Sequence, residues 1–245
     1  MPQIADIRLP VIQLVKVSVD YRGAKGNRPV LSEVSVGFPE RTLTAVVGPS
    51  GAGKSTLLRC ASGLERPSQG KVFRGSRELD AMDEQELTAF RSLFVPQQPE
   101  LLPALTTYEN VAQASCITGL KAQQTAIMET LRQVGLEDEA GQKPAELSAE
   151  QQKRVTIARS LVTDPEILFV DEPADSLDHA GGRRIMNLLR AMVEQGGRTV
   201  VMVTRDPAVA ACADRVVFLV GGRVVGKIDW PTADEVAAEL ARQQP

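Results

Sequence analysis

The chain has 245 residues, of which 43% are hydrophobic and 24% are charged, and its formal net charge at pH 7 is −3. This composition is typical of a globular protein with a substantial core and excludes the basic surface of a nucleic-acid-binding protein. No apolar stretch approaches the roughly 18 residues that span a bilayer, and residues 1–16 lack signal-peptide character, so we expect a cytoplasmic protein.

Strand-like segments alternate with helical ones along much of the chain, which predicts an α/β fold with a mainly parallel sheet. The early strands follow one another without helices, which indicates a small antiparallel β lobe near the N-terminus. All four side chains of Ile167–Val170 are apolar, as in a central strand covered on both faces. The expected strands are Val11–Val19, Thr42–Val47, Lys71–Arg74, Leu93–Val95, Ile167–Val170, Thr199–Val203, Arg215–Val220 and Arg223–Ile228.

Helical patterns without a convincing strand fill the middle of the chain. We expect residues 98–163 to form a helical subdomain inserted into an α/β core made of residues 1–97 and 164–245. The capping box that begins at Thr232 opens a last helix, which runs to about Gln243. The helices expected in the inserted subdomain are Thr107–Thr118, Ala122–Val134 and Ser148–Thr163.

The segment Gly48–Ser55 reads GPSGAGKS and fits the phosphate-binding pattern G-x-x-x-x-G-K-[ST]. A predicted strand precedes it, and a helix over Lys54–Ser62 follows, with Gly63 as its left-handed cap. Glycines let main-chain N–H groups wrap phosphates, and the helix N-terminus adds positive potential. Lys54 supplies a charge for the β- and γ-phosphates, and Ser55 offers a hydroxyl to Mg²⁺. The alternative, a glycine-rich turn with a surface lysine, is disfavoured by the flanking strand and helix.

Two carboxylates, Asp171 and Glu172, follow the buried strand Ile167–Val170. In this position Asp171 can hold Mg²⁺, directly or through water, and Glu172 can polarise an attacking water. Two acids at an ordinary strand end are the alternative, which the preceding phosphate-binding loop disfavours. Cys60, Cys116 and Cys212 are too far apart for a metal site, and we expect them to be buried or half-buried. The single histidine, His179, is expected to face solvent near a helix start.

Over nearly its whole length the chain resembles the ATPases of ATP-binding-cassette (ABC) transporters, which are P-loop NTPases with a RecA-like fold. Within that family, the macrolide-export, lipoprotein-release and cell-division ATPases are most similar to this chain in the sequences of Leu105–Val111, Asp171–Pro173 and Val201–Thr204. The segments that carry the resemblance are the adenine-stacking position Tyr21, the P-loop Gly48–Thr56, the Q-loop glutamine Gln97, the signature Leu147–Gln151, the D-loop Ser176–Asp178 and the switch segment Thr204–Pro207.

The resemblance implies ATP and Mg²⁺ as cofactors and assigns roles to individual residues. It assigns catalysis to Glu172, Gln97 and Arg205, and metal binding to Ser55, Gln97 and Asp171. The residues that it assigns to nucleotide binding are Tyr21, Gly48, Pro49, Ser50, Gly51, Ala52, Gly53, Lys54, Ser55, Thr56, Ser148 and Asp178.

The resemblance also implies partners. Family members form head-to-tail dimers in which ATP lies between the P-loop of one subunit and the signature of the other, so we expect a homodimer or a heterodimer with a second ABC ATPase subunit. A membrane permease is expected on a separate chain, since this sequence has no membrane-spanning segment. The helical subdomain, with Gln97–Val111 at its hinge, would contact that permease and hold the protein at the inner face of the cell membrane.

The signature departs from the family pattern L-S-G-G-Q, because Ala149 and Glu150 replace both glycines. Ser148 and Gln151 still form a capping-box pattern, so we expect the helix start to survive. If the Glu150 carboxylate points towards the phosphate bound across the dimer, two like charges roughly 5 Å apart repel by about 3 kcal/mol at a dielectric constant near 20. If the carboxylate turns to solvent, screening removes most of this repulsion.

Arg205 stands where the family has the switch histidine. Arginine has five N–H donors, no acceptor and a permanent charge, whereas neutral histidine both donates and accepts. The guanidinium can contact the γ-phosphate, stabilise developing charge, pair with Glu172, or face solvent as a loop residue.

Three functions are compatible with these motifs. We expect an energy-supplying subunit of a membrane transporter or membrane-remodelling complex, with slow or partner-dependent hydrolysis. A regulatory subunit that binds ATP with little hydrolysis is the alternative, which Glu150 and Arg205 favour, whereas the intact Glu172 argues against a fully inactive site. A soluble ABC ATPase acting on nucleic acid is less compatible, because the chain has one cassette and no basic stripe. A kinase or GTPase with the same P-loop leaves Gln97, Ser148 and the D-loop unexplained.

Overall fold

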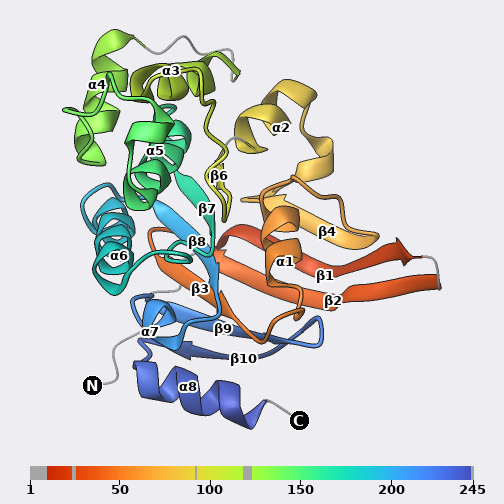
Figure 1. Cartoon of the computed structure of the whole chain (residues 1–245). Coiled ribbons are helices and arrows are strands. Elements are labelled where there is room, and N and C mark those ends of the chain that lie inside the picture. The colour runs from red at the N-terminus through yellow and green to blue at the C-terminus, as the bar shows by residue number, and fades with distance from the viewer. Residues whose placement is uncertain (1–9, 24–25, 92, 118–122, 244–245) are drawn as a thin grey trace, which may run out of the picture.

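The structure, a computed structural model, describes residues 10–23, 26–91, 93–117 and 123–243. Its core is a six-stranded sheet with the strand order β10-β9-β3-β8-β7-β6 (Figure 1). Neighbouring strands are parallel except for β10, which pairs antiparallel with β9. The predicted α/β fold with a mainly parallel sheet is therefore confirmed. The strands of this sheet are β3 (Leu43–Val47), β6 (Phe94–Val95), β7 (Ile167–Asp171), β8 (Thr199–Thr204), β9 (Arg215–Val220) and β10 (Arg223–Asp229).

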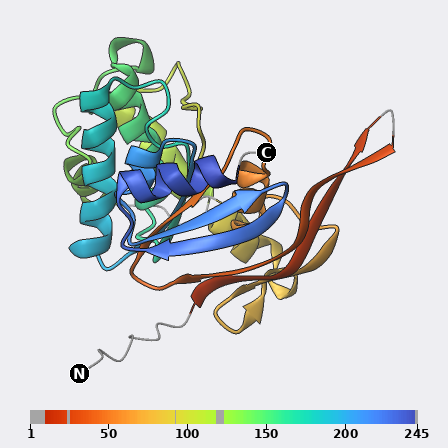
Figure 2. The ribbon, with the colours of Figure 1, turned by 90° about the horizontal axis from the view of Figure 1, so that it is seen from below.

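A second sheet is antiparallel, has the strand order β2-β1-β4-β5, and confirms the predicted β lobe. Its first two strands form a long ribbon that extends away from the core (Figure 2). The strand β2 was not predicted, because irregular pairing with β1 and a left-handed residue at Glu33 (φ 50°) interrupt the alternation that marks a strand. The strands of this sheet are β1 (Pro10–Gly23), β2 (Gly26–Pro39), β4 (Gln69–Arg74) and β5 (Arg77–Glu78).

Between β6 and β7 the described chain forms helices and loops, as predicted, and α3, α4 and α5 stand together at one end of the molecule (Figure 1). The predicted helix limits Thr118 and Ala122 lie outside the described residues. The helices are α1 (Lys54–Ala61), α2 (Glu84–Arg91), α3 (Thr107–Ile117), α4 (Gln124–Gln133), α5 (Ala149–Leu161), α6 (His179–Glu194), α7 (Pro207–Ala210) and α8 (Ala233–Arg242), with 3₁₀ turns η1 (Leu79–Ala81) and η2 (Pro144–Glu146).

The core sheet is apolar on both faces because each face meets its own hydrophobic cluster. Leu168 and Val170 of β7 join the cluster that includes α5 and α6. Ile167 and Phe169 join the cluster that includes α1, α2 and the antiparallel sheet. This explains why every residue of β3, β7 and β8 is buried.

The predicted helix ends are confirmed by their hydrogen bonds. Capping boxes begin α5 at Ser148 and α8 at Thr232, and Gly63 follows α1 with a φ of 73°. His179 is the first residue of α6 and is exposed, as expected.

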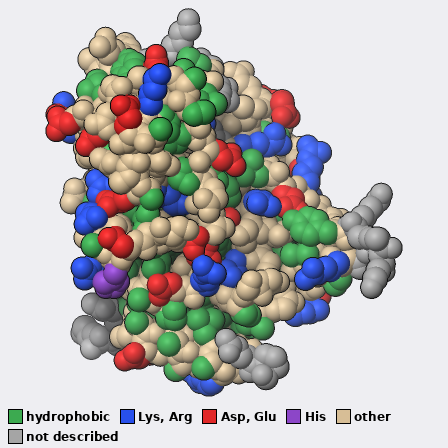
Figure 3. Space-filling model, viewed as in Figure 1, with side chains coloured by type: hydrophobic (Ala, Val, Ile, Leu, Met, Phe, Trp, Pro, Cys, Tyr) green, Lys and Arg blue, Asp and Glu red, His purple; other side chains and the backbone are tan. Residues whose placement is uncertain are grey.

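The prediction for the cysteines was correct only for Cys60, which is buried. Cys116 in the last turn of α3 and Cys212 just after α7 are exposed, because both lie on outward-facing turns. On the face of the molecule in Figure 3, basic and acidic side chains are interspersed, in keeping with the small net charge.

The buried Asp214 links the core sheet to α6. Its carboxylate accepts the Leu43 N–H at 2.8 Å and the Arg190 guanidinium at 2.5 Å. Arg190 also pairs with Glu194 one turn along α6, and the Glu194 side chain is 57% exposed. The two acids therefore share one arginine in very different environments.

We predict that Asp214→Ala lowers the free energy of unfolding by about 2 kcal/mol, because it leaves the buried Leu43 N–H without an acceptor and Arg190 paired with Glu194 alone. Glu194→Ala is the matched control and should cost less than about 0.5 kcal/mol. Urea unfolding of both variants measures the difference, and equal losses would show that Asp214 is not a structural link.

Candidate functional site

A pocket of about 390 Å³ lies where β3, β8, β7 and β6 end. The carboxyl ends of neighbouring parallel strands meet at one edge of a sheet, so the loops that follow these strands come together there. The residues that line it are Tyr21, Arg28, Val30, Ser50, Gly51, Ala52, Gly53, Lys54, Ser55, Thr56, Gln97, Glu172 and Arg205.

The loop between β3 and α1 requires glycine at particular positions. Gly51 and Gly53 have φ values of 79° and 96°, which side-chain-bearing residues rarely adopt. A Cβ on Gly48 would lie 2.0 Å from the Leu219 carbonyl oxygen, and one on Gly53 would lie 2.7 Å from that of Val30. The loop therefore packs tightly on both sheets with its main chain facing the pocket.

Lys54, the first residue of α1, lies inside the loop that precedes it. Its ammonium donates to the carbonyl oxygens of Gly48 at 2.8 Å and Pro49 at 3.1 Å. Burial lowers the pKa of this ammonium, while the nearby Glu172 and Asp171 carboxylates act in the opposite direction. The Lys54 ammonium is thus held within the glycine-rich loop, and Lys54 lines the pocket together with residues of that loop.

Ser55 and Asp171 bring two oxygen donors together at this floor. The Ser55 hydroxyl donates to the buried Asp171 carboxylate at 3.1 Å. Burial raises the pKa of Asp171, and the Ser55 hydrogen bond opposes the rise. Hydroxyl and carboxylate oxygens, with the amide oxygen of Gln97 on the same pocket, are hard donors of the kind that Mg²⁺ prefers. These residues fit that cation.

Glu172 follows Asp171 in a left-handed conformation with a φ of 43°. Such strain in a non-glycine residue is common at functional sites. Its carboxylate accepts the backbone N–H of Arg205 at 3.3 Å. Burial raises the pKa of Glu172, and the bonds from Arg205 and Thr204 oppose the rise.

The Arg205 side chain pairs with Asp175 and not with Glu172. Its Nη2 donates to Asp175 at 2.8 Å, and Gln97 Nε2 donates to the other oxygen of the same carboxylate at 2.9 Å. Asp175 therefore connects Gln97 and Arg205, two pocket residues whose roles were predicted separately from the sequence. Nothing in the sequence distinguished Asp175 from an ordinary loop acid.

Lys153 of α5 is almost completely buried and fixes the main chain at Gln97. Its ammonium donates to the carbonyl oxygens of Pro96 at 2.9 Å and Gln97 at 2.8 Å. Burial lowers its pKa to about 8, against the attraction of Asp171, Asp175 and Glu172. Lys153 was not among the residues predicted from the sequence. A lysine among the buried positions of a helix does, however, indicate a paired charge, because unpaired lysines are almost never fully buried.

Tyr21 lies at the rim of the pocket and is 42% exposed. Its hydroxyl is 3.2 Å from Thr56 Oγ1 and donates to Glu65 at 2.8 Å. These contacts join β1 to α1. Arg28 and Val30 of the unpredicted strand β2 line the same pocket and were missed with that strand.

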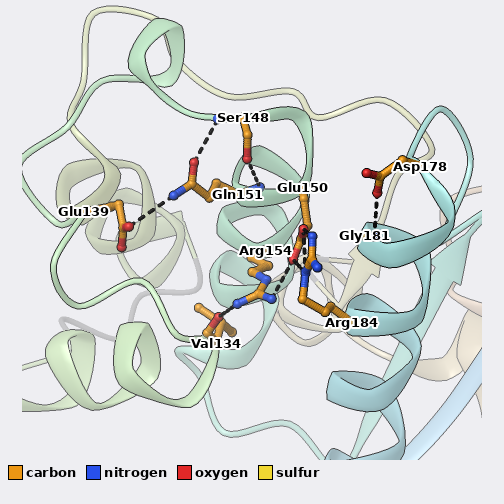
Figure 4. Close-up of polar contacts among 9 residues, drawn as sticks. All are labelled: Val134, Glu139, Ser148, Glu150, Gln151, Arg154, Asp178, Gly181 and Arg184. Carbon is orange, nitrogen blue, oxygen red and sulfur yellow. Dashed lines mark hydrogen bonds and ion pairs between the residues drawn. The ribbon is translucent and has the colours of Figure 1, made fainter.

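Ser148 and Asp178 do not line this pocket. Each caps a helix: Ser148 accepts the Gln151 N–H at 3.2 Å to begin α5, and Asp178 accepts the Gly181 N–H at 2.6 Å to begin α6 (Figure 4). The two helix starts lie side by side, with Glu150 between them. Within one chain the structure therefore separates the signature and D-loop segments from the P-loop pocket.

The Glu150 carboxylate does not turn to solvent, since its side chain is only 15% exposed. It is bound by Arg154 at 2.6 Å and by Arg184 of α6 at 2.5 Å (Figure 4). A Cβ on Gly181 would lie 3.3 Å from the same carboxylate, so the small residue allows this approach to α6. The Arg184 hydrogen bond, with Arg154, holds the pKa of Glu150 below its usual value. Two guanidinium groups thus compensate the added negative charge.

Comparisons with known proteins agree with this arrangement. A family profile described as ABC transporter matches residues 31–175. The macrolide export ATP-binding/permease protein MacB 1/2 of Paracoccus denitrificans is 37% identical over 94% of this chain and 35% of its own length. The chain therefore spans about a third of the length of that relative.

Other matches cover both chains almost fully. The ABC transporter ATP-binding protein Rv0986 of Mycobacterium tuberculosis is 34% identical over 91% of this chain and 92% of its own. The solved dimeric structure of the ATP-binding cassette MJ0796, a Methanocaldococcus jannaschii protein, in a post-hydrolysis state with ADP and Pi gives a TM-score of 0.82 at 34% identity, over 90% of this chain and 99% of that one. Among the described residues, no helix has the length and apolar character needed to cross a membrane.

The burial of Lys153 leads to a prediction about pH. Because the folded-state pKa is about 8 and the usual value is about 10.4, the folded protein binds fewer protons than the unfolded chain between these values. Stability should therefore rise with pH in this window. We predict that the free energy of unfolding of the wild type rises by about 2 kcal/mol relative to Lys153→Met from about pH 8 to about pH 10.

Denaturant unfolding of both proteins across this range makes the measurement, and other titrating groups cancel in the difference. A difference that stays constant from neutral to alkaline pH would mean that Lys153 keeps an ordinary pKa in the folded state.

Proposed function

The chain belongs to the ABC transporter family, and we propose that it binds ATP with Mg²⁺ and hydrolyses it slowly to drive a membrane transporter. The observation that carries this proposal is the arrangement of Lys54, Ser55 and Glu172 around one pocket at the ends of the parallel strands, with Asp171 bonded to Ser55. An ammonium, oxygen donors for a cation and a carboxylate base are the groups that phosphoryl transfer to water requires.

In the proposed site each group has a defined task. The main-chain N–H groups of Gly51–Ser55 and the N-terminus of α1 bind the phosphates, and Lys54 neutralises their charge. The oxygens of Ser55, Asp171 and Gln97 hold Mg²⁺, which screens the negative charge of the phosphates. Glu172 accepts a proton from the attacking water, and its raised pKa makes it a stronger base than an exposed glutamate. Tyr21 stacks on the base at the rim.

We propose slow hydrolysis because Glu150 in the signature and Arg205 at the switch position both depart from the family residues. Arg205 has no acceptor atom with which to replace a neutral histidine. Glu150 is paired within its own chain, so it adds little net negative charge to the signature, but it puts a side chain in the first turn of α5 where the family has glycine. A regulatory subunit with little hydrolysis is the second candidate, and the same two substitutions favour it.

The proposed partners are a second ABC ATPase subunit and a membrane permease. A dimer lets Ser148 and Asp178, which stand outside the pocket, reach the nucleotide of the other subunit. That the Methanocaldococcus jannaschii cassette was solved as a dimer, and that the Paracoccus relative is named an ATP-binding/permease protein, support these partners.

We assign the permease contact to a groove of about 610 Å³ between the core and residues 98–163, which we propose as a helical subdomain. Leu64 and Phe94 from the core and Ala114 from α3 line this groove, together with Arg59 and Arg159. A permease bound there would hold the protein at the inner face of the cell membrane.

The test of the proposed function separates binding from turnover. Lys54→Ala should weaken ATP binding about 10- to 100-fold, because a charge-assisted contact is worth about 1.5–3 kcal/mol. Glu172→Gln should bind ATP normally and lose about 100-fold or more in hydrolysis. Titration calorimetry and phosphate release measure the two effects.

Absence of ATP binding to the wild type in the presence of Mg²⁺ would refute the proposal. Binding without any hydrolysis above the Glu172→Gln level, with partners present, would favour the regulatory subunit.

Restoring the family residues tests the explanation for slow turnover. Glu150→Gly with Arg205→His should raise the hydrolysis rate about 10-fold, an effect of about 1.4 kcal/mol on the barrier. Steady-state phosphate release at saturating ATP makes the comparison with each single variant. An unchanged rate would mean that the two substitutions do not limit turnover.

A further inference from the structure

Three hydrogen-bond donors converge on one carboxylate that no motif assigns. Asp175, in the loop between β7 and α6, accepts Gln97 Nε2 at 2.9 Å, Arg205 Nη2 at 2.8 Å and Ser176 Oγ at 3.0 Å. Its side chain is only 14% exposed, whereas that of Arg205 is 69% exposed. A nearly buried acid thus holds two residues of the pocket wall.

We propose that Asp175 is the positioning residue of this site: it sets the orientation of the Gln97 amide and holds the Arg205 guanidinium away from Glu172. The proposal rests on the function proposed above, because both residues that it positions face the nucleotide pocket. Asp175 itself does not line that pocket.

The orientation of Gln97 follows from the charge of Asp175. Three donors, one of them the Arg205 guanidinium, meet the two oxygens of Asp175, so the carboxylate pairs there as an anion. An ionised carboxylate only accepts hydrogen bonds, so the amide of Gln97 must present Nε2 to it. The oxygen Oε1 is then turned away from Asp175 and is the end offered to a cation.

The main chain of Gln97 is fixed independently. Lys153 binds the carbonyl oxygens of Pro96 and Gln97 from the opposite side, so the backbone at this point is tied to α5. The side-chain torsions are the freedom that remains, and the bond to Asp175 removes it.

The position of Arg205 follows from competition between two acids. Its backbone N–H already touches Glu172, so its side chain starts beside that carboxylate. Pairing with Asp175 gives the guanidinium another acceptor. Without Asp175, Arg205 would be free to pair with Glu172 and to occupy the carboxylate oxygens that would otherwise accept a proton from water.

The first experiment measures binding and needs no hydrolysis. A non-hydrolysable ATP analogue is titrated with and without Mg²⁺ into the wild type, Asp175→Ala and Asp175→Asn. Alanine removes the acceptor that orients the Gln97 amide. The ratio of analogue affinities with and without Mg²⁺ should therefore fall about 10-fold, the effect expected when a residue that orients a metal ligand is lost. Asparagine keeps an acceptor for Gln97 and should preserve that ratio.

The second experiment measures turnover in a double-mutant cycle. When the oxygen of an asparagine at position 175 accepts the Gln97 hydrogen bond, its NH₂ group faces Arg205. An NH₂ group cannot accept a hydrogen bond from a guanidinium, so Arg205 loses its partner. Asp175→Asn should lower kcat about 10-fold with little change in KM, and less than about 2-fold in an Arg205→Gln background.

The control is Asp164→Asn, which weakens a similar ion pair with Arg198 at 2.7 Å outside the pocket and should leave binding and kcat unchanged. An unchanged Mg²⁺ effect in Asp175→Ala, or an equal kcat loss in both Arg205 backgrounds, overturns the inference. A wild type that binds the analogue but never hydrolyses ATP refutes only the proposed hydrolysis, and the binding experiment still decides the role of Asp175.

Discussion

The parallel alignment of β3, β8, β7 and β6 is the constraint on which the site depends. Because all four strands point the same way, the P-loop, the two acids at the end of β7, Arg205 and Gln97 arrive at one edge of the sheet. Hydrophobic clusters on both faces fix this edge, since the apolar residues of these four strands belong to one cluster or the other. The groups around the pocket are therefore positioned by buried apolar contacts made elsewhere in the sheet.

The two substitutions in the family motifs each have a counter-charge in the same chain. Glu150 is neutralised by Arg154 and Arg184, and Arg205 is neutralised by Asp175. A substituted charge at a phosphate site is costly when it is unpaired, and pairing lowers that cost while restricting the side chain. Each substituted residue and its ion-pair partner thus form a local rearrangement within the site.

The features that could be predicted from the sequence are those formed by residues close together in the chain. The P-loop, the buried strand β7 and the capping boxes depend on backbone conformation, side-chain periodicity and neighbours three residues apart. The pairs Arg205–Asp175 and Arg184–Glu150 join residues 30 and 34 positions apart, and only packing of α5, α6 and the loops brings them together. The strand β2 escaped prediction for a different reason, because its irregular pairing with β1 breaks the alternation.

The most direct measurement is a crystal structure of the wild-type chain with Mg²⁺ and a non-hydrolysable ATP analogue. We predict that the phosphates lie on the main-chain N–H groups of Gly51–Ser55, with Ser55 and Asp171 at the cation and Arg205 still bound to Asp175. Phosphates bound away from this loop, or an Arg205 guanidinium on Glu172 with Asp175 unpaired, would contradict it.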